Sequence, residues 1–525
     1  MKKTITKNIK PLVSNPDADV LKIKTERNGL GTIKTMIVLL LLMLQLALFL
    51  LTFLYFVSFF RVFSIISYIL SLATCLYVLS SNKNSQSKPI WILFLLVCSS
   101  FGWLVYLISD ERIFWFKHKK RYNNILEESN RFVSHEEINN LNIINKSECE
   151  YLSKAGNFKT YKNSKTKYFP SGTKFFDSVL EDIMKAKEFI FIEFFIISDG
   201  LLLTRLLSIL KEKVKEGVDV RIIYDDFGSS KSFKRKTKKL IKSYGIKLTS
   251  FNNLISGFSM LLNYRDHRKI VVIDGKVAYT GGANLADEYT NEKRLYGYWK
   301  DSGIKLEGPC VDALTLMFLR CWAFVTKKQV NFSSYLNKSE SFNNNSIIVP
   351  YADGLEYQDN IGKNAYTNLI SNANEKIYIM SPYFVIDDTI RNLLINKAKS
   401  GVDVRIILPE IADKKVVYMI SRNTAEKLMK FGIKLYTMKN SFVHSKVMLT
   451  ENSAIVGSIN MDLRSFYQQF ESAVYLNDKE TLKDIESDFS NTFNISTFIE
   501  GKKLKRNKLT FRMVAGVVNL ISPFM

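Results

Sequence analysis

Two histidines, each followed two residues later by a lysine, are the groups in this sequence best suited to catalysis. The chain contains only four histidines, and two of them, His267 and His444, are followed by Lys269 and Lys446. An imidazole can attack phosphorus or protonate a leaving oxygen, and an ammonium group stabilises negative charge on phosphoryl oxygens. Two such pairs, if brought together, predict chemistry on an anionic centre such as a phosphodiester.

The two pairs belong to two copies of one repeated segment. Four landmarks recur in the same order, namely GVDVRII at 217–223 and 401–407, GIKL at 245–248 and 432–435, H-x-K at 267–269 and 444–446, and G-x-x-N at 281–284 and 457–460. The offset between copies lies between 176 and 187 residues, which is far longer than a solenoid repeat. We therefore expect two copies of one domain, packed about a pseudo-twofold axis that brings both His–Lys pairs together.

Short β-rich runs alternate with helical patterns around these landmarks. Residues 188–197, 218–224 and 270–273 read as strands, and residues 201–216 and 233–244 as helices. This alternation favours an α/β fold, with mixed or parallel sheets covered by helices. If each H-x-K lies in a strand, its histidine and lysine project from the same face, because residues i and i+2 do so.

The composition restricts the class of protein and the kind of partner. The chain has 525 residues, 47 % of them hydrophobic, with only 9 prolines and 23 glycines, which excludes a disordered or collagen-like protein. The formal net charge of +24 indicates an anionic partner, either nucleic acid or a membrane surface. The five cysteines form no C-x-x-C pair and no H-E-x-x-H occurs, so neither a disulfide framework nor a metal site is expected.

Three apolar runs near the N-terminus predict membrane spans. Residues 36–60, 62–79 and 89–108 contain no charged residue, and each is about as long as the roughly 17–25 residues that cross a hydrocarbon core. Lysines and arginines flank both ends of this region. Three crossings would put these basic ends on opposite faces, so either one run lies in the interface or the N-terminal arm is translocated. We expect a multi-pass protein of the cell membrane with its catalytic part in the cytoplasm.

The whole chain is thus expected to contain N-terminal transmembrane helices followed by two tandem α/β domains. The predicted divisions are a basic arm at 1–35, the transmembrane region at 36–110, a connector at 111–150, a first domain at 151–330, a linker at 331–348, a second domain at 349–500, and a basic, then apolar, interfacial tail at 501–525.

The two motif segments resemble the signature of the phospholipase D superfamily, H-x-K-x-x-x-x-D followed by G-G/S-x-N. They read HRKIVVIDGKVAYTGGAN at 267–284 and HSKVMLTENSAIVGSIN at 444–460. Within that superfamily the chain is similar to the cardiolipin synthases of Gram-positive bacteria, from the apolar N-terminus to the end of the chain. The resemblance implies two phospholipase D-like domains.

The same resemblance implies roles for individual residues. One of His267 and His444 forms a phosphatidyl-histidine while the other is the general acid, and the family favours His267 as the nucleophile. The remaining implied site residues are Lys269, Lys446, Asn284, Ser458 and Asn460 around the phosphate, Asp301 and Glu471 as carboxylates that orient the histidines, and Asp274 and Glu451 as the acids of the two motifs.

The second motif departs from the family pattern in two ways. Glu451 replaces the aspartate, and one residue is missing between Lys446 and Gly457. Because the motif acid of the superfamily mainly braces local structure, we expect a glutamate beside a shortened turn to serve the same purpose. Glu193, a lone acid in an apolar strand, is open between a pocket-lining and a hydrogen-bonded structural position.

The implied activity is the joining of two phosphatidylglycerol molecules into cardiolipin and glycerol, with no metal or other cofactor. A phospholipase D or another phosphatidyltransferase, which would use water or a different alcohol, remains open. A membrane-tethered nuclease and an inactive membrane scaffold are less favoured, the nuclease because of the apolar runs. The expected partners are the phospholipid substrate and an anionic membrane surface, with no nucleic acid; the oligomeric state stays open.

Overall fold

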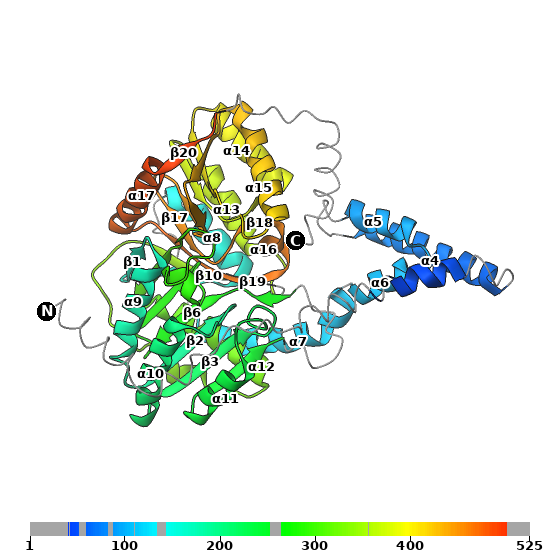
Figure 1. Cartoon of the computed structure of the whole chain (residues 1–525). Helices are drawn as coiled ribbons and strands as arrows, with labels where there is room; N and C mark the ends of the chain where they lie inside the picture. The colour runs from blue at the N-terminus through cyan, green and yellow to red at the C-terminus, as the bar shows by residue number, and fades with distance from the viewer. Residues whose placement is uncertain are drawn as a thin grey trace.

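The computed structural model describes residues 40, 43–51, 59–81, 88–109, 111–133, 143–252, 264–354 and 356–500. Two α/β halves form one body, and a group of N-terminal helices projects from it (Figure 1). The predicted basic arm at 1–35 and the interfacial tail at 501–525 lie outside the described residues.

The first half is built on a seven-stranded mixed sheet with the order β1-β9-β7-β6-β2-β3-β4. One of its inner strands, β2, reads FIFIEF and is buried along its whole length, as expected of a strand covered on both faces. The strands are β1 (Lys165–Phe169), β2 (Phe189–Phe194), β3 (Asp219–Asp225), β4 (Lys247–Phe251), β6 (Lys269–Ile273), β7 (Val277–Gly281) and β9 (Gly303–Glu307).

The second half repeats this topology in the order β10-β19-β17-β16-β11-β13-β14, with one additional strand, β20, at the edge. The strands are β10 (Ile348–Asp353), β11 (Lys376–Met380), β13 (Asp403–Pro409), β14 (Lys434–Met438), β16 (Val447–Leu449), β17 (Ala454–Gly457), β19 (Gln469–Leu476) and β20 (Ser496–Phe498). Strand by strand, the order is that of the first sheet. The predicted duplication is therefore present in the fold.

Helices cover both sheets, and a single cluster of buried apolar side chains extends across the two halves. The helices of the first half are α9 (Gly172–Ile183), α10 (Leu201–Lys215), α11 (Arg235–Ser243) and α12 (Val311–Thr326). Those of the second half are α13 (Ile361–Asn372), α14 (Asp388–Lys399), α15 (Lys415–Leu428), α16 (Leu463–Tyr467) and α17 (Lys479–Asn494). Short 3-10 helices are η2 (Asp287–Thr290), η3 (Phe332–Tyr335) and η4 (Met429–Phe431).

Three pairs of very short strands complete the fold, and two of these pairs join the halves. Strand β5 (Arg265–Asp266) of the first half runs parallel to the start of β19 in the second. Strand β8 (Tyr298–Lys300) of the first half runs parallel to β15 (Ser441–Val443) of the second. The third pair, β12 (Phe384–Val385) and β18 (Met461–Asp462), lies within the second half.

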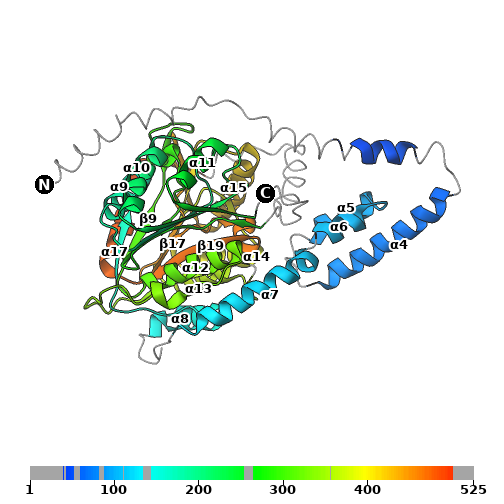
Figure 2. The same cartoon turned by 90° about the horizontal axis from the view of Figure 1, so that it is seen from below.

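The predicted connector contains two helices that attach to different halves. Helix α7 (Glu111–Asn130) packs on α12, and α8 (Ile143–Gly156) packs on α13 and β10. Figure 2 shows α7 running from the projecting helices along the body towards α8. The predicted linker also contains structure, because η3 packs Phe332 and Leu336 into the core.

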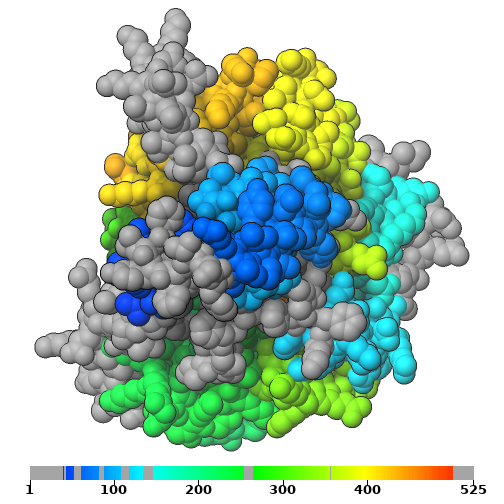
Figure 3. All heavy atoms as spheres, turned by 90° about the vertical axis from the view of Figure 1, so that its right-hand side faces the viewer, coloured from blue at the N-terminus to red at the C-terminus, as the bar shows by residue number. Residues whose placement is uncertain are grey.

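The projecting group consists of α4 (Phe59–Ser80), α5 (Lys88–Val97) and α6 (Gly102–Ser109), seen towards the viewer in Figure 3. A small cluster, Cys75, Val78, Leu95 and Tyr106, holds them together. Among the described residues, one helix, α4, is long and apolar enough to cross a membrane. The predicted span at 89–108 is divided into α5 and α6 by the turn at 98–101, and most of the predicted span at 36–60 lies outside the described residues.

Candidate active site

Both H-x-K motifs lie where the chain leaves one sheet and enters another. His267 and Arg268 fall between β5 and β6, and residues 444–446 fall between β15 and β16. The expectation that each motif lies within a continuous strand is therefore wrong. The preceding short strand pairs with the opposite half, whereas the following strand pairs within its own sheet, so strand geometry is interrupted at the histidine.

The register of the two joining pairs places each histidine beside a carboxylate of the other half. Phe470 pairs with Asp266, so the next residues, Glu471 and His267, lie side by side. The Nδ1 atom of His267 is 2.9 Å and 3.0 Å from the two carboxylate oxygens of Glu471.

The second histidine, which belongs to the second half, is oriented in the same way by a carboxylate of the first half. Lys300 pairs with Val443, so Asp301 and His444 come next to each other. The Nδ1 atom of His444 is 2.8 Å from Oδ2 of Asp301. A carboxylate at Nδ1 selects the tautomer that leaves Nε2 as the reactive nitrogen. The two carboxylates thus occupy the orienting position that the sequence assigns to them, each serving the histidine of the opposite half.

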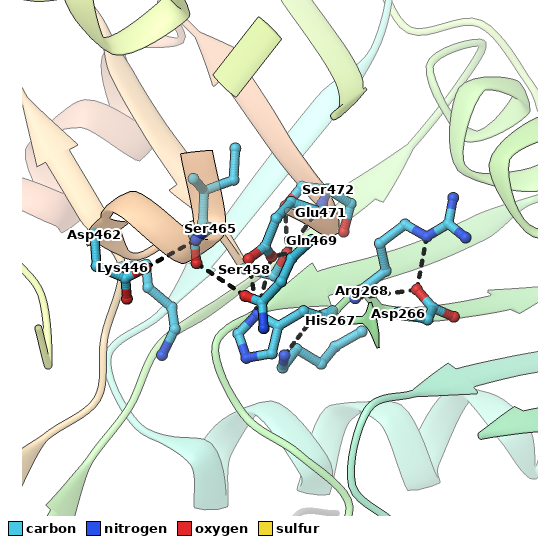
Figure 4. A network of polar contacts seen from close by, with 12 residues as sticks. Asp266, His267, Arg268, Lys446, Ser458, Asp462, Ser465, Gln469, Glu471 and Ser472 are labelled. Atoms are coloured by element: carbon cyan, nitrogen blue, oxygen red, sulfur yellow. Dashed lines mark hydrogen bonds and ion pairs between the residues drawn. The ribbon is translucent and has the colours of Figure 1, made fainter. Parts of the chain in front are cut away.

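Ser458 supports one of the two carboxylates and does not line the cavity described below. Its hydroxyl donates to Oε2 of Glu471 and accepts from the backbone N–H of Ser472 at 3.0 Å. Figure 4 shows this network above the His267 ring. The equivalent position in the first half is Gly282, where an added Cβ would lie 2.2 Å from Oδ1 of Asp301. At Gly282 there is no room for a side chain beside Asp301, whereas at Ser458 the side chain anchors Glu471.

The two motif lysines are buried beside their histidines. Lys269 and Lys446 are each 1 % exposed, and each donates from Nζ to the backbone carbonyl of its own motif histidine. Lys446 Nζ also lies 2.8 Å from Nδ1 and 3.2 Å from Nε2 of His444. The ammonium group of Lys446 thus rests against the imidazole of its histidine, and that of Lys269 is held on the backbone of its histidine.

Burial governs the ionisation of this centre. Desolvation, reinforced by Lys269 and Lys446, holds the pKa of His267 well below its ordinary value, and desolvation together with Lys446 lowers the pKa of His444 to about 4. Desolvation also lowers the pKa of Lys269 to about 7 and that of Lys446 to about 8. Burial raises the pKa of Glu471 to about 7, against the opposing charge of Lys269. Both imidazoles are therefore neutral at pH 7, as a nitrogen nucleophile must be.

Both histidines line one cavity of about 330 Å³ between the halves. Six of its twenty lining residues are Phe, Tyr or Trp, and the ring centroids of Tyr289 and Trp299 lie 5.3 Å and 5.4 Å from that of His444. Phe195 takes the corresponding place beside His267, at 5.0 Å. The other lining residues are Ile196, Phe227, Asn284, Glu288, Tyr296, Tyr383, Val385, Asp413, Lys414, Val417, Ile420, Asn460, Asp462, Arg464 and Gln469. Such a cavity suits a charged centre carried on an apolar molecule.

The two motif asparagines both line the cavity but differ in what they bind. Asn284 accepts from the backbone N–H of Ile196 at 3.1 Å and donates to the hydroxyl of Tyr289 at 2.6 Å. Asn460 is 5 % exposed, and its Oδ1 has no hydrogen-bond partner among the described residues. The amide of Asn460 is thus the one with polar capacity left for a ligand.

The two motif acids brace the sheets outside the cavity walls. Asp274 accepts the backbone N–H groups of Lys187, Glu188 and Phe189 at 2.8–2.9 Å, at the start of β2. Glu451 accepts the corresponding three from residues 374–376 at 2.7, 3.3 and 3.3 Å, at the start of β11. The glutamate therefore makes the contacts of the aspartate.

A shorter turn accompanies this substitution. Ile273 pairs with Val277 across a three-residue loop, whereas Thr450 already bonds to Ser453 across two residues. The residue missing from the second motif is therefore absent from this turn, where the longer side chain of Glu451 reaches the same backbone groups.

A second buried cluster lies beside the centre without lining the cavity. Glu193 and Asp266 each lie 2.9 Å from the Nε atom of Arg268, and Cys321 is close enough for the two acids and its thiol to hold a metal ion. The guanidinium already supplies the positive charge there, and the donor set of one thiol and two ion-paired carboxylates is a poor fit for a cation. Glu193 is thus an ion-paired structural acid.

Sequence reasoning passed over the charged side chains that line the cavity away from the motifs. Glu288 and Arg464 each stand four residues after a motif asparagine, so a comparison of the two copies beyond G-x-x-N contained the signal. The aromatic wall carried no comparable signal, because Tyr and Trp are ordinary residues of a core.

Comparisons with known proteins agree with this geometry. The family model described as cardiolipin synthase, PLD-like domain, matches residues 179–295 and 366–493. Cardiolipin synthase 2 of Bacillus cereus is 31 % identical over 457 residues, 85 % of this chain and 88 % of that protein. A cardiolipin synthase of Oceanobacillus iheyensis is also 31 % identical, over 88 % of this chain and 98 % of that protein.

A solved structure supports the fold independently of close sequence similarity. The phosphatidylserine synthase of Haemophilus influenzae superposes with a TM-score of 0.57 at 14 % identity, over 73 % of this chain and all of that chain.

Proposed function

The chain belongs to the cardiolipin synthase family of the phospholipase D superfamily, and on this basis we propose that it transfers a phosphatidyl group between two phosphatidylglycerol molecules through a phosphohistidine. The products are cardiolipin and glycerol. The observation that carries the proposal is the pair of histidines on one cavity, each held at Nδ1 by a carboxylate of the opposite half.

In the first step, Nε2 of one histidine attacks the phosphorus of the donor lipid. A P–N bond forms while the bond from phosphorus to the glycerol oxygen breaks, and the other histidine donates a proton to that oxygen. The bound phosphodiester anion offsets the charge of Lys269 and Lys446, which raises the pKa of the histidine that must arrive protonated.

In the second step, the hydroxyl of a second phosphatidylglycerol attacks the phosphohistidine. It gives its proton to the histidine that protonated glycerol, a P–O bond forms, and the P–N bond breaks. Lys269 and Lys446 stabilise charge on the non-bridging oxygens, and the free carbonyl oxygen of the Asn460 amide orients the lipid. Family resemblance favours His267 for the attack, although the two histidines have equivalent surroundings.

The test is lipid synthesis by the full-length protein in cells that lack cardiolipin. The parent should restore cardiolipin, and His267→Ala and His444→Ala should each abolish it while the protein stays in the membrane fraction, because the two steps need both imidazoles. Normal cardiolipin from either variant would remove that histidine from the mechanism. Chromatography of products from labelled phosphatidylglycerol separates transfer from hydrolysis, since water as acceptor gives phosphatidic acid.

We also place the protein at the cell membrane, with the N-terminal helices as its anchor. Val62, Ile65 and Leu76 on α4 are 61 %, 59 % and 61 % exposed, far more apolar surface than a helix in water normally shows. The hydrocarbon core of a bilayer would cover this exposed apolar surface. The predicted multi-pass arrangement extends this proposal to residues 36–60 and 89–108.

The catalytic halves are proposed to face the cytoplasm, because basic segments next to the membrane favour that side. A cysteine at the exposed linker position Glu340 tests this, since Cys149, Cys310 and Cys321 are buried. A membrane-impermeant maleimide should label Glu340→Cys only after the cells are permeabilised. Labelling in intact cells would place the halves outside.

A further inference from the structure

Two equivalent positions of the duplicated site carry opposite charges. Glu288 stands four residues after Asn284, and Arg464 stands four residues after Asn460. Both side chains line the active cavity. The charged lining differs between the halves: the first contributes Glu288, and the second contributes Arg464 together with Lys414, Asp413 and Asp462. Arg464 is thus a cation with no counterpart at the equivalent position of the first half.

Arg464 is not paired directly with an acid of the described residues; burial lowers its pKa, and the charges of Asp462 and Asp225 oppose this from nearby. Its Nε is buried without a hydrogen-bond partner, and the side chain forms no ion pair with the described residues. The oxygens of these two acids bond to backbone groups and not to the guanidinium. Asp462 accepts from the backbone N–H of Ser465, and Asp225 accepts from those of Phe227 and Gly228.

The backbone around Arg464 is fixed. Asp462 caps α16 through its bond to Ser465, and β18 pairs with β12 immediately before it. The guanidinium is therefore carried by a rigid part of the backbone. A buried hydrogen-bond donor without a partner costs free energy unless a ligand accepts its hydrogen bond.

The proposed reaction needs more than one anion site. The acceptor phosphatidylglycerol carries its own phosphodiester, three carbons from the hydroxyl that attacks. The two His–Lys pairs serve the reacting phosphate, so the second phosphate requires another cation in the same buried cavity.

We infer that Arg464 binds the phosphodiester of the acceptor lipid, and so selects an anionic lipid alcohol over water or free glycerol as the acceptor. The inference rests on the proposed function and deepens it. Glu288, at the equivalent position, repels a second phosphate from the other end of the cavity. The acceptor therefore enters in a single orientation.

The test compares two acceptors that attack the same phosphohistidine. Full-length enzyme in mixed micelles of phosphatidylglycerol is given labelled glycerol. Labelled phosphatidylglycerol reports attack by an acceptor without phosphate, and cardiolipin reports attack by one with it. In both reactions a P–O bond replaces the P–N bond, and the acceptor's proton goes to the second histidine.

Arg464→Gln should lower cardiolipin formation by about 10–100-fold more than glycerol exchange, the range that one charge-assisted contact gives. Arg464→Lys, which keeps the charge but loses the planar fork, should fall between this variant and the parent. Arg391, an exposed arginine on α14 that forms an ion pair with Asp388, supplies the matched control: Arg391→Gln should leave both rates unchanged.

Rates are compared only between proteins that show the parent's thermal unfolding; if the glutamine variant fails this check, the lysine variant decides. Equal loss of both reactions, or loss of neither, would overturn the inference while leaving cardiolipin synthesis by the parent intact. A parent that exchanges glycerol yet forms no cardiolipin would overturn the proposed function, and the inference with it.

Discussion

Replacing Glu451 by alanine should weaken the fold more than the chemistry, because this acid holds three backbone N–H groups and does not line the cavity. A buried hydrogen bond contributes about 1 kcal/mol. Asp274, with three bonds of 2.8–2.9 Å at the start of a fully buried strand, then contributes about 3 kcal/mol. For Glu451 two bonds are 3.3 Å long and the side chain is only partly buried, whereas Asp274 is buried, so about 1–2 kcal/mol is expected.

These energies translate into measurable differences in melting temperature. At about 2–4 °C per kcal/mol for domains of this size, Glu451→Ala should lower the midpoint of thermal unfolding by several degrees, and Asp274→Ala by about twice as much. Tryptophan fluorescence in one detergent measures both, and cardiolipin formation well below the midpoint should stay within a few-fold of the parent. Glu451→Asp should be milder than the alanine variant. An alanine variant that melts like the parent but is inactive would refute the bracing assignment.

Two further predictions concern the catalytic centre. Asp301→Asn and Glu471→Gln should each reduce turnover by about 10²–10⁴-fold with little change in lipid binding, because the wrong histidine tautomer is no longer disfavoured; a variant with normal turnover would show that its carboxylate does not orient the histidine. Activity and stability should also change in opposite directions above neutral pH. In the proposed mechanism charged Lys269 and Lys446 bind the phosphate. Burial lowers their pKa values to about 7 and about 8, so KM for the lipid should rise as pH increases through this range. The unfolded chain keeps these protons to about pH 10 and so binds more protons than the folded one, which makes the free energy of unfolding increase over the same interval; parallel pH profiles of activity and thermal unfolding check both signs, and a KM that stays flat to pH 9 would contradict the first.

The sequence was sufficient for the duplicated α/β fold and named the residues of the two motifs that the structure brings to one cavity, but not the other charged residues that line it. The landmarks GVDVRII and GIKL fall on the strands β3 and β13 and at the starts of β4 and β14, because buried strands keep a recognisable run of β-branched residues. His267, His444, Asp301 and Glu471 were all identified as site residues. These residues can be recognised from their types and spacing alone, without knowledge of how the chain packs.

The pairing of each histidine with a carboxylate of the opposite half was not predictable from the sequence. Which carboxylate serves which histidine depends on joining strands of two and three residues, and strands so short carry no periodicity. Ser458 was expected near the phosphate or as a group that orients a histidine. It instead hydrogen-bonds to the carboxylate of Glu471, and this contact depends on the acid opposite being a glutamate rather than an aspartate. The division of residues 89–108 into two helices was also hidden, since an uninterrupted apolar run does not reveal a turn.

The exchange of carboxylates between the halves also sets when the enzyme becomes active during its synthesis. Glu471 follows His267 by 204 residues, and at about 5–20 residues per second the ribosome needs about 10–40 s to make that stretch. Until then the first histidine has its lysine but nothing to fix its tautomer. A chain released early by truncation would consequently sit at the membrane with a complete His–Lys pair and remain unable to attack the surrounding phospholipid.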